Sequence, residues 1–311
     1  NASGAELYRA CIELGKVWTE VGNAKGRADV VAHGMELLEL GPQVYLHLHT
    51  SLNATQSNRS ATESAGIRCW PAIATGPHSP VAAWPPKATE SFRGYSQLLY
   101  SGALSSSQVS EIYSSFSTNG CGARLLVIGS PTVATNGAVL SSGDAYGLGY
   151  GLLQHDEIEP FLLHYFAMSA HGYNRGSFVA PESSNIADRG IPATTYSAVA
   201  EVVAPTYLKW MLCFEEPETR TLWLAKATPR DWLAPGEQPL RAYNLTTRYG
   251  RISYTLSTAT ALVAPEVAGV ATVPAPAPAY SVHASVHLPP SFVAAPPSGG
   301  IRLRIRAPLD H

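Results

Sequence analysis

Two groups of carboxylates occupy the middle of the chain. Asp156, Glu157 and Glu159 come at the start of an apolar helical pattern, and Glu182 follows that pattern in a loop. Two carboxyl groups can divide acid and base work, since one protonates a leaving oxygen while the other activates water, as hydrolysis of a glycosidic bond requires. We therefore take Glu182 with Asp156 or Glu157 as a candidate catalytic pair. Glu159 precedes Pro160 and is expected to be a helix cap.

The same acids also have a structural explanation. Acids at a helix N-terminus are favoured by the helix dipole and by capping, so Asp156 and Glu157 need no catalytic role there. Glu182 equally fits a surface glutamate or an ion pair with Arg175 or Arg189. Because the chain contains 23 acids, position in the fold has to decide between these alternatives.

Groups suited to holding a sugar lie near the acids. Aromatic rings offer apolar faces for stacking, and imidazole, phenol and guanidinium groups form hydrogen bonds with hydroxyls. The candidate substrate-binding residues are His155, Tyr146, Tyr150, Tyr173 and Arg175, with Trp70 and Trp84 as further loop aromatics. Packing explains the aromatics equally well. His164 and His171 are seven residues apart, too far for shared metal ligation, so neither a metal nor a cofactor is expected.

Several other classes of chemistry lack their motifs. No G-x-S-x-G elbow, phosphate loop or H-E-x-x-H pair is present. Gly147, Gly149 and Gly151 resemble part of a dinucleotide fingerprint, but no strand–helix context supports it. The net charge of −2 and the absence of a Lys/Arg cluster argue against nucleic-acid binding. The sequence contains no run of about 18 or more apolar residues, so it predicts no transmembrane helix.

Composition and sequons indicate a secreted glycoprotein. Charged residues make up 14%, against about 25% in typical proteins, so glycans would help to solvate the surface. N-x-S/T sequons without proline begin at Asn1, Asn53, Asn58 and Asn244. The alternative is that these sequons arise by chance, because the chain is rich in serine and threonine. The first residues lack the features of a signal peptide. We therefore expect that the signal peptide has been removed or that the chain begins within a larger precursor.

Four cysteines allow three complete pairings and form no C-x-x-C motif, which argues against a zinc site. Cys69 and Cys121 lie in loop-like sequence and are the favoured disulfide partners, whereas Cys11 and Cys213 lie in apolar helical patterns. Cys213 is expected to be a small buried hydrophobic residue.

Apolar spacing predicts a helical domain over residues 1–217. Gly41 and Pro42 are expected to separate two helices, because proline disfavours a helix interior. The expected helices cover 5–20, 28–40, 43–52, 95–100, a segment capped by Ser105 or Ser106, 156–171, and 195–214 with a bend at Pro205. The 156–171 helix is apolar nearly all round, which predicts burial on most of its faces.

Residues 218–311 read as an antiparallel β-sandwich, because apolar and polar residues alternate there. The expected strands cover 221–224, 249–256, 280–288 and 301–306. The residues expected to be buried are Val282, Val286, Ile301, Leu303 and Ile305; those expected to be exposed are Arg302, Arg304 and Arg306. Trp223 and Trp232 are expected in the core.

Two stretches carry a family resemblance. Residues 152–165 (LLQHDEIEPFLLHY), continuing to 180–183, and residues 221–233 (TLWLAKATPRDWL), followed by 247–250, resemble six-hairpin glycosidase-like proteins. The resemblance covers most of residues 25–310 and implies an (α/α)6 toroid followed by a β-sandwich. It is specific for architecture and says little about substrate. A full toroid needs about twelve helices, more than this chain offers, so a missing N-terminal segment or a second polypeptide would have to complete it.

Two functions follow from the resemblance and the residues. The first is an inverting glycoside hydrolase acting on a polysaccharide or glycan, with Glu182 and Asp156 or Glu157 as the acid and base. The second is a non-catalytic extracellular structural or carbohydrate-binding glycoprotein that retains the fold. A polysaccharide lyase is a third option. Carboxyl groups about 6.5–9.5 Å apart would fit inversion, and about 5–5.5 Å would fit retention.

Overall fold

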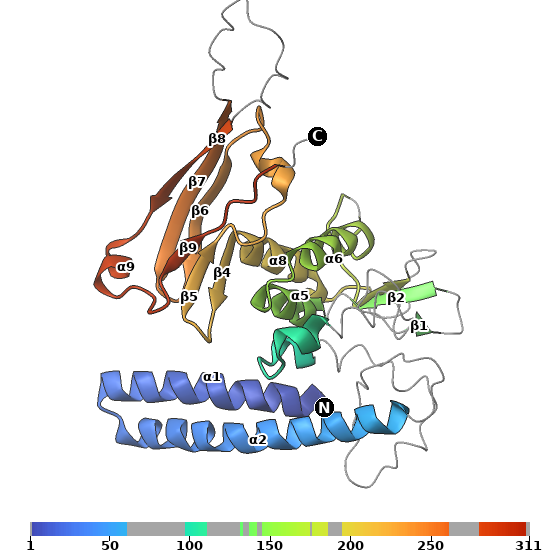
Figure 1. Cartoon of the computed structure of the whole chain (residues 1–311), viewed down its shortest axis with the longest axis vertical. Helices are drawn as coiled ribbons and strands as arrows, with labels where there is room; N and C mark the ends of the chain where they lie inside the picture. Colours follow the sequence, from blue (N-terminus) through green and yellow to red (C-terminus); the bar gives the residue numbers. More distant parts are fainter. Residues whose placement is uncertain are drawn as a thin grey trace, which may run out of the picture. The chain divides into compact units, whose positions relative to one another are not determined.

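The computed structural model describes residues 2–60, 97–110, 131–132, 137–141, 145–174, 176–185, 195–260 and 280–308. These residues form helices and small sheets, so the fold is α+β, as expected (Figure 1). The chain divides into two compact units, Asn1–Tyr207 and Leu208–His311. The boundary between the units, after Tyr207, lies earlier in the chain than the expected boundary near residue 217.

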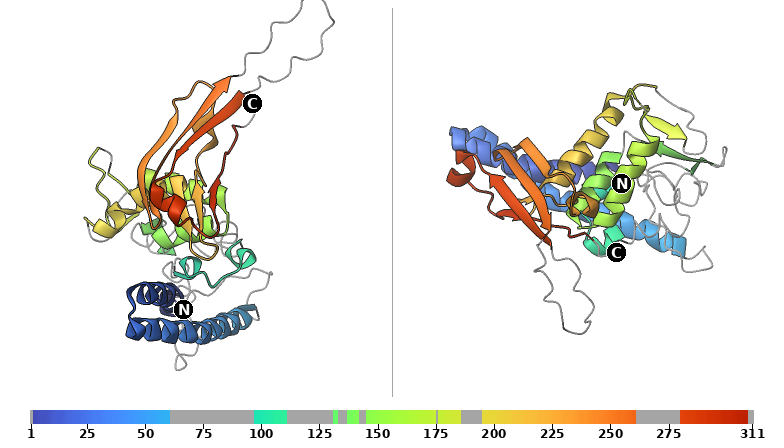
Figure 2. Two further views of the ribbon diagram at one scale, coloured as in Figure 1. Left: turned by 90° about the vertical axis from the view of Figure 1, so that its left-hand side faces the viewer. Right: turned by 90° about the horizontal axis from the view of Figure 1, so that it is seen from above.

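The N-terminal unit begins with a helical hairpin, whose two helices lie side by side in Figure 1 and in the left view of Figure 2. Helices α1 (Ala2–Lys25) and α2 (Ala28–Ser60) confirm the helical prediction. Gly26 links them in the left-handed conformation, with φ of 65°, which glycine adopts at little cost. The expected break at Pro42 is wrong, because α2 continues through it. Packing against α1 on both sides of this proline, at Leu38 and Leu48, holds the helix together.

Glycines set the spacing between α1 and α2. A Cβ atom added to Gly34 would lie 2.5 Å from Thr19 Oγ1 and 2.9 Å from the carbonyl oxygen of Gly15. One added to Gly41 would lie 2.7 Å from Ile12 Cδ1. The two backbones therefore approach more closely than any side chain would permit, as in other small-residue helix pairs.

Short elements make up the rest of the N-terminal unit. Helical turns cover 97–100 and 106–110. The helices are α5 (Ala145–Gln154), α6 (Ile158–His171), α7 (Ala198–Glu201) and the start of α8 (Val203–Leu212). The strands β1 (Pro131–Thr132), β2 (Gly137–Ser141) and β3 (Ser183–Asn185) form an antiparallel sheet in that order. This sheet was not predicted, so the unit is not purely helical.

Two helix predictions need correction. The helix expected over 195–214 is broken at Val202, and the chain becomes a strand at Cys213. Pro205 lies in the first turn of α8, where a missing N–H costs nothing, so it does not bend the helix. Helix α6 is not buried on most faces, because Leu163 and Phe166 are 41% and 50% exposed.

In the described part of the C-terminal unit, the strands form two three-stranded sheets with the orders β4-β5-β9 and β6-β7-β8. The strands are β4 (Cys213–Glu216), β5 (Thr221–Leu224), β6 (Leu240–Thr247), β7 (Gly250–Thr260), β8 (Tyr280–His287) and β9 (Ile301–Leu303). A 3-10 helix, η3 (Arg230–Leu233), and a short helix, α9 (Pro290–Ala294), accompany them. We predicted an antiparallel sandwich, but strand β9 pairs with β5 in parallel, so the prediction is wrong for this pair of strands.

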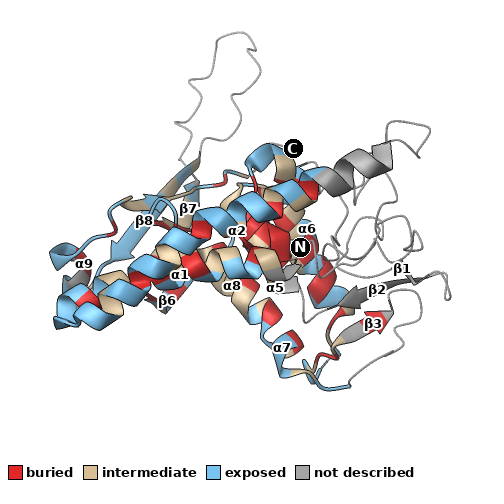
Figure 3. Cartoon of the chain, turned by 90° about the horizontal axis from the view of Figure 1, so that it is seen from below, coloured by how far each residue is buried: buried red, intermediate tan, exposed pale blue. Residues whose placement is uncertain are grey.

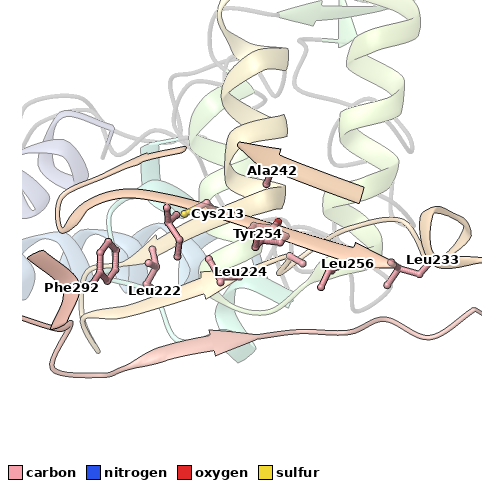
Figure 4. Packing of buried hydrophobic residues seen from close by; sticks show 10 residues of the cluster. Cys213, Leu222, Leu224, Leu233, Ala242, Tyr254, Leu256 and Phe292 are labelled. Atoms are coloured by element: carbon pink, nitrogen blue, oxygen red, sulfur yellow. The ribbon is translucent and has the colours of Figure 1, made fainter. Parts of the chain in front are cut away.

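Both sheets contribute to one apolar cluster (Figure 4). Leu222 and Leu224 come from β5, while Ile252 and Leu256 come from β7, and all four are fully buried. Each such side chain stabilises the fold by about 1.5–3 kcal/mol. Tyr254 also lies in the cluster, and its hydroxyl donates to the carbonyl of Leu212 at 2.8 Å. Trp223 and Trp232 are only half-buried and lie outside this cluster.

The burial pattern expected at the C-terminus is partly wrong. Ile305 is 42% exposed and Arg306 only 8%, the reverse of the prediction. The alternation fails because β9 ends at Leu303, and Arg306 instead donates to the carbonyl of Thr228 at 3.1 Å. Val286 faces the buried side of its sheet but remains 39% exposed, because β8 is an edge strand that the core does not fully cover.

Candidate functional site

The predicted acids lie at the corner between α5 and α6. The N–H of Glu157 donates to the carbonyl of Leu152 at 2.8 Å, and Asp156 has a left-handed φ of 66°. This is the hydrogen-bond pattern that ends many helices, in which the left-handed position usually holds glycine. Asp156 is exposed and Glu157 is half-buried. The backbone thus turns sharply at the acids and directs the side chain of Asp156 to solvent.

A serine-rich turn brings further polar groups to this corner. Ser106 Oγ lies 3.1 Å from His155 Nδ1, and the Ser110 hydroxyl donates to the carboxylate of Glu157. The turn itself is fixed by a capping box: the N–H of Ser105 donates to Gln108 Oε1 at 2.9 Å, and the N–H of Gln108 donates to Ser105 Oγ at 3.3 Å. The predicted cap at Ser105 is therefore confirmed.

We call Ser106, Ser110, His155, Asp156 and Glu157 the corner cluster. Its serine hydroxyls and the Asp156 carboxylate are exposed and Glu157 is half-buried, whereas Nε2 of His155 is buried and its Nδ1 faces Ser106. Hydroxyl groups both donate and accept hydrogen bonds and carboxylates accept them, which suits a ligand rich in hydroxyls.

One of the predicted sugar-stacking tyrosines, Tyr150, instead packs together with Tyr100 around an arginine. The Arg9 guanidinium lies 3.8 Å from the ring centre of Tyr100 and 4.4 Å from that of Tyr150, and it also donates to the carbonyl of Tyr100. Tyr146 meets Tyr100 edge-on, with ring centres 5.5 Å apart. Tyr150 is only 6% exposed, and burial raises its pKa to about 12 against the opposing effect of Arg9. These contacts are cation–π packing, and they leave Tyr150 no face for a sugar.

Tyr173 also has a structural role. Its hydroxyl donates to the carbonyl of Ala200 at 2.7 Å and accepts from the N–H of Ala204 at 2.9 Å. It therefore joins α7 to α8 across the break at Val202. Burial raises the pKa of this phenol, which keeps its proton in place for the donated bond.

The two halves of the expected catalytic pair lie at opposite ends of α6. Asp156 and Glu157 precede the helix, whereas Ser184, two residues after Glu182, donates to the carbonyl of His171 at its last residue, at 3.0 Å. Helix α6 has 14 residues, so its ends lie about 21 Å apart. That geometry does not favour the separation of about 6.5–9.5 Å that an inverting pair needs.

The remaining predicted residues are the sequon asparagines, the cysteines, and several residues outside the part of the chain that the structure describes. Asn53 and Asn244 are exposed, as expected of glycosylation sites. Cys11 and Cys213 are free and buried, and burial raises the pKa of the Cys213 thiol to about 12. The predictions that lie outside the described residues concern Asn1, Trp70, Trp84, Cys69, Cys121, Arg175 and Arg189, and the side chain of Asn58.

Sequence reasoning missed Arg9, Ser106 and Ser110, because their partners are 47 to 91 residues away along the chain. Within the described ranges, no cluster of three His, Cys, Asp or Glu side chains could hold a metal ion. Across the same ranges, none of the helices has the length and apolar character needed to cross a bilayer.

Comparison with known proteins identifies no relative: no protein-family model, curated protein or solved structure matches this chain.

Proposed function

We propose that this protein is an extracellular carbohydrate-binding glycoprotein that does not hydrolyse its ligand with the acids Glu182 and Asp156 or Glu157. The observation that carries the proposal is the position of these acids at opposite ends of α6. Acids placed in this way can each contact a sugar, but they cannot act on the same glycosidic bond. Exposure of Asn53 and Asn244 supports the glycoprotein part of the proposal.

The proposal includes the finer architecture of a partial (α/α)6 toroid followed by a β-sandwich. Support for the toroid comes from the antiparallel hairpin of α1 and α2, which is the repeating element of such folds. Support for the sandwich comes from the apolar cluster to which both sheets of the C-terminal unit contribute. Sugar binding is assigned to the corner cluster, whose groups complement hydroxyls.

Binding to a panel of immobilised glycans tests this function, with the full chain and the variant Asp156→Ala. We expect the variant to lose about tenfold in affinity, which is the effect of one charge-assisted hydrogen bond. Glu159→Ala is the matched control, because Glu159 is also an exposed acid at the start of α6. Equal loss in both variants, or no glycan bound by the unmodified protein, would contradict the proposal.

An inverting glycoside hydrolase is the second candidate. The observation in its favour is the exposed Asp156 beside a Glu157 whose carboxylate is already held by Ser110. Release of reducing sugar from the same glycan panel separates the two functions. Turnover that falls by about 10²–10⁴-fold in both Glu182→Gln and Asp156→Asn would establish the hydrolase. We expect no turnover in any form of the protein.

A further inference from the structure

The outward face of the sheet β6-β7-β8 has an unusual set of side chains. Residues at alternate positions of β7, from Arg251 to Ser257, point away from the buried cluster, because Ile252, Tyr254 and Leu256 point into it. Partners across an antiparallel ladder point to the same side. The register therefore places these side chains on one face: Arg241 and Thr246 of β6, Arg251, Ser253, Thr255 and Ser257 of β7, and Ser281, His283, Ser285 and His287 of β8.

This outward face, which we call the hydroxyl face, contains positive charge and no negative charge. None of the three strands contains an aspartate or glutamate. Arg241 and Arg251 are exposed, and neither has an ion pair or a side-chain hydrogen bond to any described residue. Two guanidinium groups thus stand among neutral hydroxyls with their donors available.

A β-bulge adds an aromatic ring at the edge of the hydroxyl face. The register of β6 against β7 shifts between Ala242 and Leu245, at Tyr243 and Asn244. Asn244 adopts a left-handed φ of 57°, and its N–H donates to Ser253 Oγ at 2.8 Å. Bulges of this kind redirect side chains at binding sites, and here Tyr243 is 84% exposed.

We propose that the hydroxyl face binds an anionic polysaccharide, whose carboxylates or sulfates pair with Arg241 and Arg251 while a sugar ring stacks on Tyr243. The proposal rests on the carbohydrate binding proposed above and adds a second site with a defined ligand charge. Guanidinium groups bind carboxylate and sulfate through two parallel N–H donors. The hydroxyls of β7 and β8 then exchange hydrogen bonds with those of the sugar.

The spacing of the charges selects a polymer of low charge density. Arg241 lies opposite Thr255, four residues from Arg251 on β7. At about 3.3 Å per residue, the two positions are about 13 Å apart along the strand. A monosaccharide cannot reach both. A nucleic acid carries a charge every few ångströms, about one per 1.7 Å in duplex DNA, and would need a denser array of cations.

Binding of the full chain, prepared without N-glycans so that none covers the face at Asn244, tests the proposal. The probes are a polyuronate, a neutral glucan and single-stranded DNA at two salt concentrations. The variant Arg241→Gln/Arg251→Gln removes both charges, and Tyr243→Ala removes the ring. Arg302→Gln is the control, because Arg302 is exposed in the other sheet of the same unit.

We expect tight, salt-sensitive binding of the polyuronate. The double arginine variant should bind it at least about tenfold more weakly, Tyr243→Ala should also weaken it, and Arg302→Gln should not. Binding of the polyuronate that the arginine variant leaves unchanged would overturn the proposal, as would tighter binding of DNA than of polyuronate. If only the neutral glucan binds, and Asp156→Ala weakens it, the hydroxyl face fails while the proposed function stands. If no polysaccharide binds, both fail.

Discussion

Replacement of Gly34 by alanine tests how the helical hairpin is held together. In an exposed helix interior this change stabilises a protein by up to about 1 kcal/mol. Here the new methyl group would lie 2.5 Å from Thr19 Oγ1, 2.8 Å from the Thr19 nitrogen and 2.9 Å from the Gly15 oxygen. Two of these atoms belong to the backbone, so rotation of a side chain cannot relieve the clash. The helices would have to separate by about 0.5–1 Å to restore normal contact distances.

Gly34→Ala should therefore destabilise the protein by about 1–3 kcal/mol, the usual cost of overpacking, in spite of alanine's helix propensity. Gly4→Ala is the matched control, because a Cβ there meets only Leu48 Cδ1, at an ordinary 3.7 Å. It should be neutral or slightly stabilising. In Figure 3 most of the surface of the two helices is coloured as exposed or intermediate.

Urea unfolding followed by circular dichroism measures both effects, and limited trypsin cleavage near Lys16 and Arg27 reports opening of the hairpin. Faster cleavage and a lower unfolding midpoint are expected in Gly34→Ala alone. A higher midpoint in Gly34→Ala, matching that of Gly4→Ala, would show that the helices do not pack through Gly15 and Gly34.

Three further predictions concern other parts of the chain. Asp156→Gly should raise the free energy of unfolding by about 0.5–1 kcal/mol, because glycine adopts a left-handed φ without strain, whereas Asp156→Ala should lower it. Thermal melts of both variants measure these changes, and the same shift in both would refute the turn geometry. Burial raises the pKa of Tyr150 to about 12, so its stabilising effect is complete below about pH 10, the unfolded value, and is lost as the pH rises through 12. Unfolding midpoints measured from pH 9 to 12 should fall less steeply in Tyr150→Phe. Mass spectrometry of material from a secreting eukaryotic host should find a glycan on Asn53 or Asn244, and occupancy of neither site would remove the support for secretion.

Sequence periodicity predicted those elements whose buried residues follow one regular repeat. Strand β7 is of this kind, since Ile252, Tyr254 and Leu256 are all buried. Helix α1 was predicted from an apolar repeat that does not match its buried face, because Leu7, Leu14 and Val17 are 45–48% exposed. Strand β6 was missed because its bulge places both Tyr243 and Asn244 between the inward residues Ala242 and Leu245, which destroys the alternation. The expected break at Pro42 failed for another reason, because contacts with α1 outweigh a local preference.

The candidate sites were harder to predict, because the chain brings them together from distant segments. Ser106 meets His155 across 49 residues, and Arg9 meets Tyr100 across 91. Nothing in the residues beside Arg9 distinguishes it from a solvated surface arginine. On the hydroxyl face, the alternation of Ser281, His283 and Ser285 was visible in the sequence, but its arginines lie on other strands and needed the register to be located.

The acid-rich corner illustrates how a structural role and a binding role can be separated. Glu157 is accounted for by its bond from Ser110, which ties the serine turn to the start of α6. Asp156 is different, because the left-handed position it occupies would be less strained with glycine. An exposed carboxylate held in a strained turn is a reasonable starting point for a hypothesis of function. If Asp156→Gly both stabilises the protein and weakens glycan binding, then this side chain contributes to the ligand site at the expense of stability. If it stabilises the protein and leaves binding intact, the corner joins two helices and the ligand binds elsewhere, with the hydroxyl face as the remaining candidate.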